Sequence, residues 1–392
     1  MLLIYGFVLK RYVLDLVPGN SLVEYLVKEG FDVYLLDFGI SGLEDAVLSL
    51  EDFVLDYMCG AVLKVLETSG AEEISLFGHS QGGTLCTMYA SLFPGGSLKN
   101  LVLVATPTEF APRNPGPLGL WTLASRNGGA FFDPAMVPQF FGNLPTDLAS
   151  QFINSVASLQ ACAVGTGARP FSFGVYDAAS RKAREWAEQD ATVRSWLAVS
   201  KWVDDAVSFP GETFRRWVRD FYQGNKLVKG EVKLRGSRVD LSNIGCAVLN
   251  VSGKWDYAVP PSQTEATTAL ARSSDKESVS LDAGHVGMLA GPGVASGPVS
   301  GTGSCPARVD RGLLASMDLP ANPIAPTSRW MAAARAWESR PSLPPVRLPT
   351  RLRADWPRGL PGSTAVAERG RRAGTFCVMK RVTGDPMEQK DS

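Results

Sequence analysis

A short apolar run, 74–77, leads directly into Gly78-His79-Ser80-Gln81-Gly82, and a helical segment follows to about Leu92. A G-x-S-x-G sequence between a strand and a helix forces a sharp reversal of the chain, which has room only for small residues at Gly78 and Gly82. The turn lifts the Ser80 hydroxyl above a sheet and beside the helix N-terminus, whose dipole favours negative charge. The segment therefore predicts a nucleophile elbow with Ser80 at its apex.

The first 105 residues alternate between apolar runs and amphipathic segments, which is typical of a parallel sheet covered by helices. Capping signals at 21–24 and 49–52 each open a helix, and Gly30 and Gly70 close them. We expect strands at 2–7, 32–37, 74–77, 101–105, 247–252 and 277–281, and further helices at 81–92 and 261–272. Together with the elbow, this pattern predicts an α/β-hydrolase fold, with a mostly parallel sheet flanked by helices.

The chain divides into four parts by composition. Residues 1–106 form the first part of the predicted core, and 241–290 form the second part. Between them, 107–240 is rich in Trp, Phe, Gly and Pro and predicts an inserted cap or lid, because long insertions on a rigid scaffold often cover a site. Residues 291–392 hold half of the 26 prolines and much Arg, without a sustained apolar period. We expect this tail to be disordered.

A serine hydroxyl needs an adjacent base, and the chain contains only two histidines. His79 is the chain neighbour of Ser80, and neighbouring side chains in a sharp turn point apart, so we interpret His79 as a packing residue. His285 lies just beyond the last predicted strand. It is the candidate catalytic base.

The acidic residue that orients His285 is predicted to be Asp256, on the loop after the strand at 247–252. The order Ser80, Asp256, His285 is the one expected for this fold. Asp275 and Asp282 remain alternatives. The expected oxyanion hole combines the backbone N–H groups of Gln81 and of Phe7, which lies at the end of the first strand.

Charge and cysteine usage exclude several classes of function. The net charge is zero and no polybasic run occurs, so we expect no nucleic-acid partner. The six cysteines lack metal-binding spacing and predict reduced thiols in the cytoplasm, and no metal site or cofactor is expected. No apolar stretch is long enough to be a transmembrane segment, and the apolar start of the chain lacks the features of a signal peptide.

Several segments beyond the elbow resemble polyhydroxyalkanoate synthases, and most of all the class III catalytic subunit. The likeness covers roughly residues 1–290 and is carried by the segments YVLDLVPGNSLV (12–23), FDVYLLDFG (31–39), WVDD (202–205), FPGE (209–212), FYQGNKL (221–227) and RVDLSNI (238–244). The motifs around Asp256 and His285 complete it. The resemblance implies transfer of (R)-3-hydroxyacyl groups from coenzyme A thioesters to a growing polyester, with a second synthase subunit and a polyester granule surface as partners.

Ser80 stands where the resemblance implies a nucleophilic cysteine. A serine ester leaves less readily toward another acceptor than a thioester does, and serine depends fully on its base for activation. The leading hypothesis is a synthase-like acyltransferase that acts through Ser80, Asp256 and His285. The alternatives are a serine esterase, lipase or polyester depolymerase, and an inactive, truncated family member, because relatives extend at both ends of the matching region.

Overall fold

The computed structural model describes residues 1–110, 139, 141–147, 198–199, 201–256, 258–281, 283–290 and 378–382. Most of the predicted cap lies outside these residues. Most of the tail from residue 291 onward lies outside them as well.

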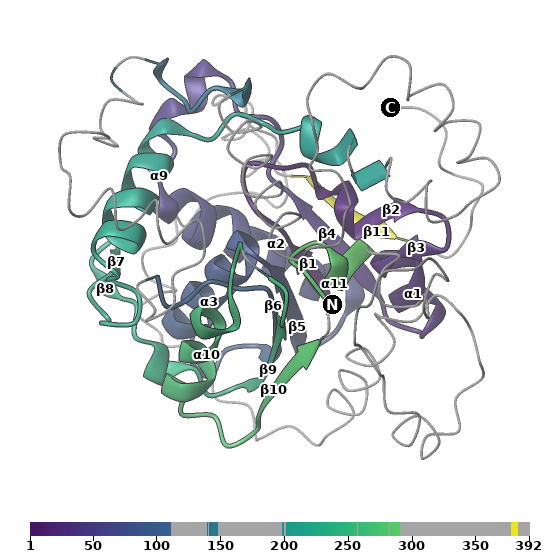
Figure 1. Cartoon of the computed structure of the whole chain (residues 1–392). Helices are drawn as coiled ribbons and strands as arrows, with labels where there is room; N and C mark the ends of the chain where they lie inside the picture. Colours follow the sequence, from purple (N-terminus) through teal and green to yellow (C-terminus); the bar gives the residue numbers. More distant parts are fainter. Residues whose placement is uncertain are drawn as a thin grey trace, which may run out of the picture.

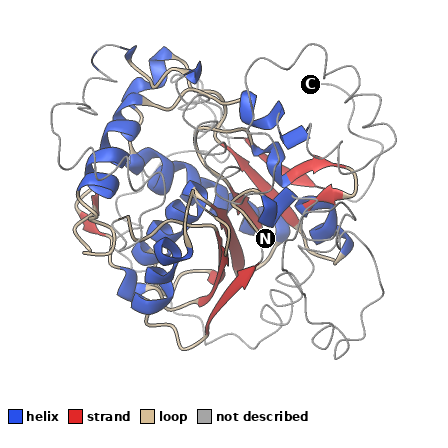
Figure 2. Ribbon diagram, in the orientation of Figure 1, coloured by secondary structure: helices blue, strands red, loops and turns tan. Residues whose placement is uncertain are grey.

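A seven-stranded sheet forms the centre of the molecule, in the order β10-β9-β6-β5-β1-β4-β11 (Figures 1 and 2). The pairs from β10 to β4 are all parallel, and β11 alone is antiparallel. The strands are β1 (Leu2–Ile4), β4 (Val33–Asp37), β5 (Ile74–His79), β6 (Leu98–Val104), β9 (Ala247–Gly253), β10 (Lys276–Leu281) and β11 (Val378–Val382). Because the parallel strands run the same way, their carboxyl ends meet at one edge, where ligands bind in open α/β sheets.

Helices pack on both faces of this sheet. The α-helices are α1 (Leu22–Lys28), α2 (Cys59–Ser69), α3 (Gln81–Leu92), α9 (Gly211–Arg216), α10 (Pro261–Leu270) and α11 (Gly287–Ala290). Shorter turns and π-helical stretches are η1 (Arg11–Leu14), η2 (Leu43–Val47), η3 (Asp52–Met58), η4 (Trp217–Gln223) and η5 (Leu241–Asn243). Two hairpins, β2 (Asp15–Val17) with β3 (Asn20–Ser21) and β7 (Lys233–Leu234) with β8 (Ser237–Arg238), complete the described elements.

Alternation along the strands divides the core into two clusters. In β1, Leu2 and Ile4 belong to the cluster under α2, α3 and η4, whereas Leu3 belongs to the cluster under α1 and α11. Successive side chains of a strand point to opposite faces, so a sheet covered on both sides needs apolar residues at every position. In β1 these three residues are all 0 % exposed. This explains why the sequence shows uninterrupted apolar runs.

Local sequence signals account for the helix ends. The hydroxyl of Ser21 accepts a hydrogen bond from Glu24 N at 2.9 Å and caps α1, while the Glu24 carboxylate accepts from Gly19 N at 2.8 Å. Gly70 ends α2 with φ of 68°, in the left-handed region that favours glycine. The predicted α/β-hydrolase fold is confirmed, with small differences in element bounds.

The first strand is shorter than predicted. It was expected over 2–7, but β1 ends at Ile4. Beyond that point the backbone leaves the sheet, and the N–H of Phe7 faces the side chain of Gln81. The end of the strand is therefore set by its approach to the elbow, a contact that periodicity alone does not indicate.

The tail contributes one element that the sequence analysis did not predict. Val378–Val382 forms β11 and pairs antiparallel with β4, although disorder was expected throughout 291–392 (Figure 1). An edge strand offers unpaired backbone groups to any extended segment. Because the pairing uses backbone groups, it does not require a repeating pattern of apolar side chains. These five residues of the tail thus form a strand in the structure.

Candidate active site

Ser80 occupies the apex of a tight turn between β5 and α3. Its φ and ψ are 52° and −125°, a strained backbone conformation for a residue other than glycine. Its backbone N–H donates to Val104 O at 2.9 Å, which ties the turn to β6. This geometry is that of a nucleophile elbow, and it places the Ser80 side chain at the carboxyl edge of the sheet.

Three glycines make the turn possible because neighbouring atoms lie where their Cβ atoms would be. A Cβ at Gly78 would come within 2.4 Å of Gly83 Cα, and one at Gly82 within 2.5 Å of Ile4 O. A Cβ at Gly83 would collide with the side chain of Thr106. Glycine at these positions lets α3 pack directly against the ends of β1 and β6.

The side chains of Ser80, His285 and Asp256 form a continuous hydrogen-bonded chain. His285 Nε2 lies 3.1 Å from Ser80 Oγ, and His285 Nδ1 lies 2.8 Å from Asp256 Oδ2. The other carboxylate oxygen of Asp256 accepts from Val259 N at 2.8 Å. Asp256 is only 3 % exposed. With Nδ1–H donating to the carboxylate, Nε2 is free to accept the serine proton.

Backbone contacts between the loops after β9 and β10 bring Asp256 and His285 together. Lys254 N donates to Leu281 O at 2.8 Å, and Trp255 N donates to Ala283 O at 3.1 Å. The loops approach so closely at Gly253 that a Cβ there would lie 2.4 Å from Ala283 O. The two loops are thus joined by main-chain bonds, and the geometry of the imidazole and carboxylate does not depend on long side chains.

The alternatives to Asp256 lie elsewhere. Asp275 directly precedes β10, so it lies at the opposite edge of the sheet from Ser80, and its carbonyl accepts from Val248 N. Asp282 is outside the described residues. Among the carboxylates the structure describes, Asp256 is the one bonded to His285.

His79 and Cys86 lie close to the elbow but are buried. His79 Nε2 donates to the backbone carbonyl of His285 at 3.4 Å, and the two imidazole rings are 5.1 Å apart. Burial, together with the nearby His285, lowers the pKa of His79 to about 3, so its ring is neutral. Burial raises the pKa of the Cys86 thiol far above its usual value, which keeps this cysteine from acting as a thiolate nucleophile.

The two predicted oxyanion donors lie on either side of the elbow. Gln81 is the first residue of α3, and the first N–H groups of a helix have no acceptor within the helix. The N–H of Phe7 donates to Oε1 of the Gln81 side chain at 3.2 Å. The structure therefore brings both residues to the site, with the second donor bonded to a side chain of the protein itself.

An aromatic cluster that the sequence analysis missed holds Phe7 in place. The Phe7 ring stacks on Phe209 with centroids 5.1 Å apart and meets Trp217 edge-on at 5.4 Å. Phe53 and Phe38 pack against the same ring. Phe209 and Trp217 belong to the segment that returns from the predicted cap. The sequence shows that Phe209 and Trp217 follow a segment rich in Pro and Gly, but it does not show that they contact Phe7.

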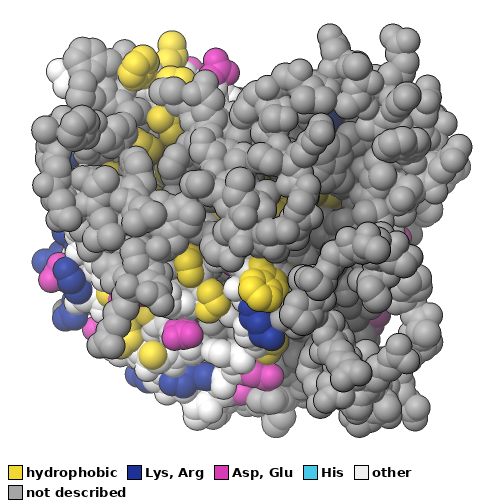
Figure 3. All heavy atoms as spheres, viewed as in Figure 1, with side chains coloured by type: hydrophobic (Ala, Val, Ile, Leu, Met, Phe, Trp, Pro, Cys, Tyr) yellow, Lys and Arg dark blue, Asp and Glu magenta, His cyan; other side chains and the backbone are white. Residues whose placement is uncertain are grey.

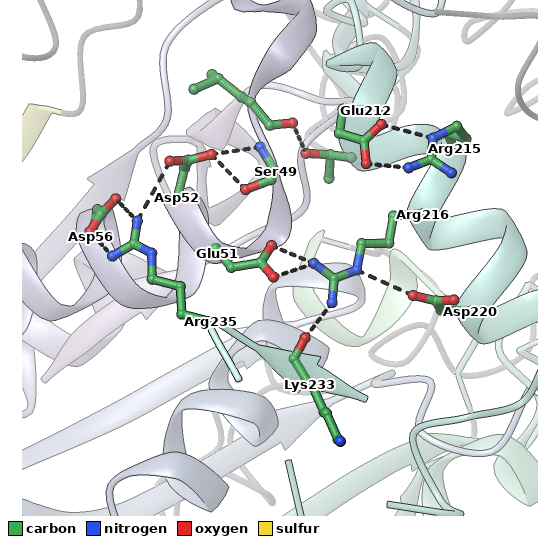
Figure 4. A network of polar contacts seen from close by, with 12 residues as sticks. Ser49, Glu51, Asp52, Asp56, Glu212, Arg215, Arg216, Asp220, Lys233 and Arg235 are labelled. Atoms are coloured by element: carbon green, nitrogen blue, oxygen red, sulfur yellow. Dashed lines mark hydrogen bonds and ion pairs between the residues drawn. The ribbon is translucent and has the colours of Figure 1, made fainter. Parts of the chain in front are cut away.

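Polar contacts fasten this returning segment to the core (Figure 4). Arg216 of α9 binds the carboxylate of Glu51, which directly precedes η3, and its Nε lies 3.2 Å from Asp220 Oδ2. Arg235 binds Asp56 of η3 in the same region. These pairs link α9 and the β7–β8 hairpin to η3, the element that also carries Phe53.

The surface and the titratable groups show few other sites. On the face drawn in Figure 3, the described side chains of both charge signs are mixed with hydrophobic ones. Within the described residues, no group of His, Cys, Asp and Glu side chains is arranged to hold a metal ion. The helices of the described part are also too short or too polar to cross a lipid bilayer.

Comparison with known proteins identifies the family. A family model for the alpha/beta hydrolase fold matches residues 1–292. The poly(3-hydroxyalkanoate) polymerase subunit PhaC of Synechocystis sp. is 34 % identical over 294 residues, which cover 74 % of this chain and 72 % of that protein. This chain belongs to the PhaC family. A PhaC subunit from Allochromatium vinosum is 31 % identical over 289 residues, covering 74 % of this chain and 75 % of its own length.

Other PhaC proteins are longer than the matching region. The PhaC subunit of Haloferax mediterranei is 31 % identical over 291 residues, and the match spans 54 % of that protein. A solved esterase from Thermogutta terrifontis has a TM-score of 0.40 and 18 % identity, covering 74 % of this chain and 83 % of that one, a likeness too weak to bear on function. Membership of the PhaC family makes this chain a polyhydroxyalkanoate synthase-like enzyme with an α/β-hydrolase fold.

Proposed function

We propose that this PhaC-family chain transfers (R)-3-hydroxyacyl groups from coenzyme A thioesters through a catalytic triad of Ser80, His285 and Asp256. The observation that carries the proposal is the unbroken chain of hydrogen bonds from Ser80 Oγ through His285 to Asp256, at 3.1 and 2.8 Å. Asp256 is buried and has both carboxylate oxygens occupied, so it holds the imidazole in one orientation.

The first step acylates Ser80. His285 Nε2 takes the hydroxyl proton as Ser80 Oγ attacks the thioester carbonyl carbon, and the negative charge collects on the carbonyl oxygen. The N–H groups of Gln81 and Phe7 stabilise this oxyanion. When the C–S bond breaks, His285 returns the proton to the leaving sulfur, which gives free coenzyme A and an ester on Ser80.

The second step decides between synthesis and hydrolysis. The acceptor that attacks the Ser80 ester is either the 3-hydroxyl group of another acyl chain or a water molecule. His285 takes the proton of the acceptor and returns it to Ser80 Oγ as the ester bond breaks. The PhaC family favours the hydroxyl acceptor. The serine itself favours a second candidate, hydrolysis, because exchange of a thioester for an oxygen ester is downhill and the acyl group then leaves less readily toward another chain.

Incubation of the full chain with (R)-3-hydroxybutyryl-CoA tests both candidates. The proposal predicts release of coenzyme A, an acyl adduct on the peptide that contains Ser80, and polymer as the product. Free 3-hydroxybutyrate with the same adduct supports the esterase instead. The matched variant Ser80→Ala should show neither adduct nor turnover.

Absence of the adduct from soluble, folded protein would contradict both candidates and favour an inactive family member.

The second synthase subunit, the granule surface and a cytoplasmic location belong to the same proposal. We infer these partners and this location from membership of the PhaC family. No cofactor is needed, because the backbone donors and His285 supply the chemistry. Addition of the second subunit of a class III synthase to the assay should raise the rate of polymer formation if that partner is required.

A further inference from the structure

The side chain of Gln81 occupies one of the two donors that the proposed reaction needs. Its amide oxygen accepts the hydrogen bond of Phe7 N–H at 3.2 Å, while its backbone N–H is the other predicted donor. The same amide oxygen lies against Gly6, where an added Cβ would approach it to 2.8 Å. One residue therefore supplies the first donor and covers the second.

A carbonyl oxygen that enters the site must compete with this amide oxygen for Phe7 N–H. An amide oxygen and a thioester or ester oxygen are both neutral acceptors, so their exchange in the ground state brings little gain. The oxyanion of the tetrahedral intermediate is a charged acceptor, and hydrogen bonds to charged acceptors are about twice as strong. Freeing Phe7 N–H costs the same hydrogen bond in both cases, so the exchange gains little for the bound substrate and stabilises the transition state.

We infer that Gln81 is a displaceable cap on the oxyanion hole: its side-chain amide holds the loop at Phe7 at rest and leaves when the acyl oxygen of an ester or thioester arrives. The inference rests on Ser80 as the nucleophile of the proposed function, and it is independent of which acyl group is transferred. Gln81 then controls how readily the carbonyl oxygen of a neutral acyl group reaches Phe7 N–H.

The surroundings of the contact support a movable cap. Phe7 is held from its ring side by Phe209 and Trp217, so its N–H stays in place when the amide leaves. Gln81 is partly exposed, and its side chain lies against a glycine that offers no side chain to retain it. The loop at Phe7 is thus held by contacts that do not involve the Gln81 side chain.

The rate at which an alkyl fluorophosphonate labels Ser80 in the full chain measures access to the hole. In this reaction Ser80 Oγ bonds to phosphorus, fluoride leaves, and His285 takes the serine proton, while the P=O oxygen needs the same donors. Gln81→Met keeps the length of the side chain but removes the acceptor. We expect it to raise the second-order labelling rate by about two- to tenfold, the range that one neutral hydrogen bond allows.

Gly6→Ala provides a second variant that leaves Gln81 unchanged. Gly6 does not have a positive φ, so alanine fits its backbone, and the new Cβ pushes only the end of the Gln81 side chain. We expect the same direction of change as for Gln81→Met. Gly245→Ala is the matched control, because its Cβ would meet only the Arg272 side chain, at 3.3 Å, and its labelling rate should equal that of the unaltered chain.

Gln81→Glu should act in the opposite direction. An ionised carboxylate binds Phe7 N–H more strongly and repels the developing negative charge, so labelling at pH 7.5 should fall by about tenfold or more. The ratio of its rate to that of the unaltered chain should rise as the pH is lowered toward the pKa of a glutamate, because the protonated form loses its charge.

Two results would overturn the inference. One is a labelling rate in both Gln81→Met and Gly6→Ala that is equal to or below that of the unaltered chain. The other is a crystal structure of the phosphonylated protein in which Gln81 Oε1 still accepts from Phe7 N–H. If the unaltered chain is not labelled at all, it is the proposed role of Ser80 that fails, and the two failures are thereby distinguished.

Discussion

His79 and Ser80 are neighbours in the chain but have opposite environments. Ser80 is partly exposed at the apex of the turn, whereas His79 is 4 % exposed and lies behind the ring of His285. Both side chains reach His285, but Ser80 contacts its imidazole whereas His79 bonds to its backbone carbonyl. One residue is therefore placed for chemistry and the other for packing, and the same turn explains both.

Replacement of the nucleophile tests the choice between the two acceptors. Ser80→Cys should raise the ratio of polymer to free acid, because a thioester intermediate passes its acyl group to a hydroxyl acceptor more readily than an oxygen ester does. The measurement is product partition with (R)-3-hydroxybutyryl-CoA, and Ser80→Ala gives the background. An unchanged or lower ratio would show that the nucleophile does not control the partition.

The buried His79 predicts a loss of stability in mild acid. Its folded pKa of about 3 lies below the ordinary value of 6.5, so the unfolded chain binds more protons between these pH values. The contribution of His79 to stability is complete above pH 6.5 and falls as the pH decreases, by up to ~1.4 kcal/mol per pH unit.

Urea unfolding at several pH values from 4.5 to 6.5 measures how stability changes with pH. The two proteins compared are Ser80→Ala and the double variant that carries both Ser80→Ala and His79→Phe. The His79→Phe protein should lose stability less steeply as the pH falls. Equal slopes would mean that His79 is not the group responsible. Asp220 does not interfere: burial tends to raise its pKa, but hydrogen bonds from Arg219 and Lys226 outweigh burial and hold it at about 2.

At the scale of elements, the returning segment of α9 and η4 supports the loop at Phe7. Trp217 and Phe221 are buried in the cluster under the sheet, and Trp217 meets the ring of Phe7. Arg216 anchors this segment through Glu51, whose pKa would rise on burial but is lowered by the guanidinium. The site thus depends on a contact between residues about 165 positions apart.

Arg216→Met should destabilise the fold by about 2 kcal/mol. Its side chain is 14 % exposed and that of Glu51 is 18 % exposed, so removal of the guanidinium leaves a largely buried carboxylate without its ion-pair partner. Arg235→Met is the matched control: its side chain is 51 % exposed, and loss of its pair with Asp56 should cost about 0.5 kcal/mol. Urea midpoints with unchanged m-values measure both changes. Similar losses in the two variants would contradict the importance of burial.

At the scale of the whole molecule, β11 closes one edge of the sheet with a strand from the far end of the chain. Tyr34 N donates to Met1 O, toward β1. Because successive N–H groups of a strand point to opposite sides, the N–H of Leu35 points toward β11, where its register partner is Lys380. The N–H of Met379, the neighbouring residue of β11, points away from β4.

Proline substitution at these two positions tests the register. Lys380→Pro removes a backbone donor that pairs with Leu35 and should increase hydrogen exchange of the amides of β4 that face β11. Met379→Pro is the matched variant, and it should change this exchange much less because its N–H has no partner in β4. Equal effects would show that the pairing is not in the observed register. Both variants should retain labelling of Ser80, since β4 and β1 separate β11 from β5.

Much of the fold could be predicted because it depends on local sequence patterns. Apolar runs located the parallel strands to within a few residues, and capping residues such as Ser21 and Gly70 located the helix ends. The exceptions were strand ends shaped by other parts of the chain, as at Ile4, and β11, whose segment shows no pattern of its own. A strand that adds to an existing edge takes its structure from its partner.

The sequence by itself determined the α/β-hydrolase fold, the elbow at Ser80, and the pair His285 and Asp256 as its candidate partners. Glycine spacing, apolar periodicity and a count of two histidines are properties of the chain that need no coordinates. Only the tertiary structure decided that Phe7 N–H is covered by Gln81 and that aromatic residues of the returning segment hold Phe7. Such contacts depend on the paths of loops and on side-chain packing across the sheet, and the periodicity of a sequence carries no information about either.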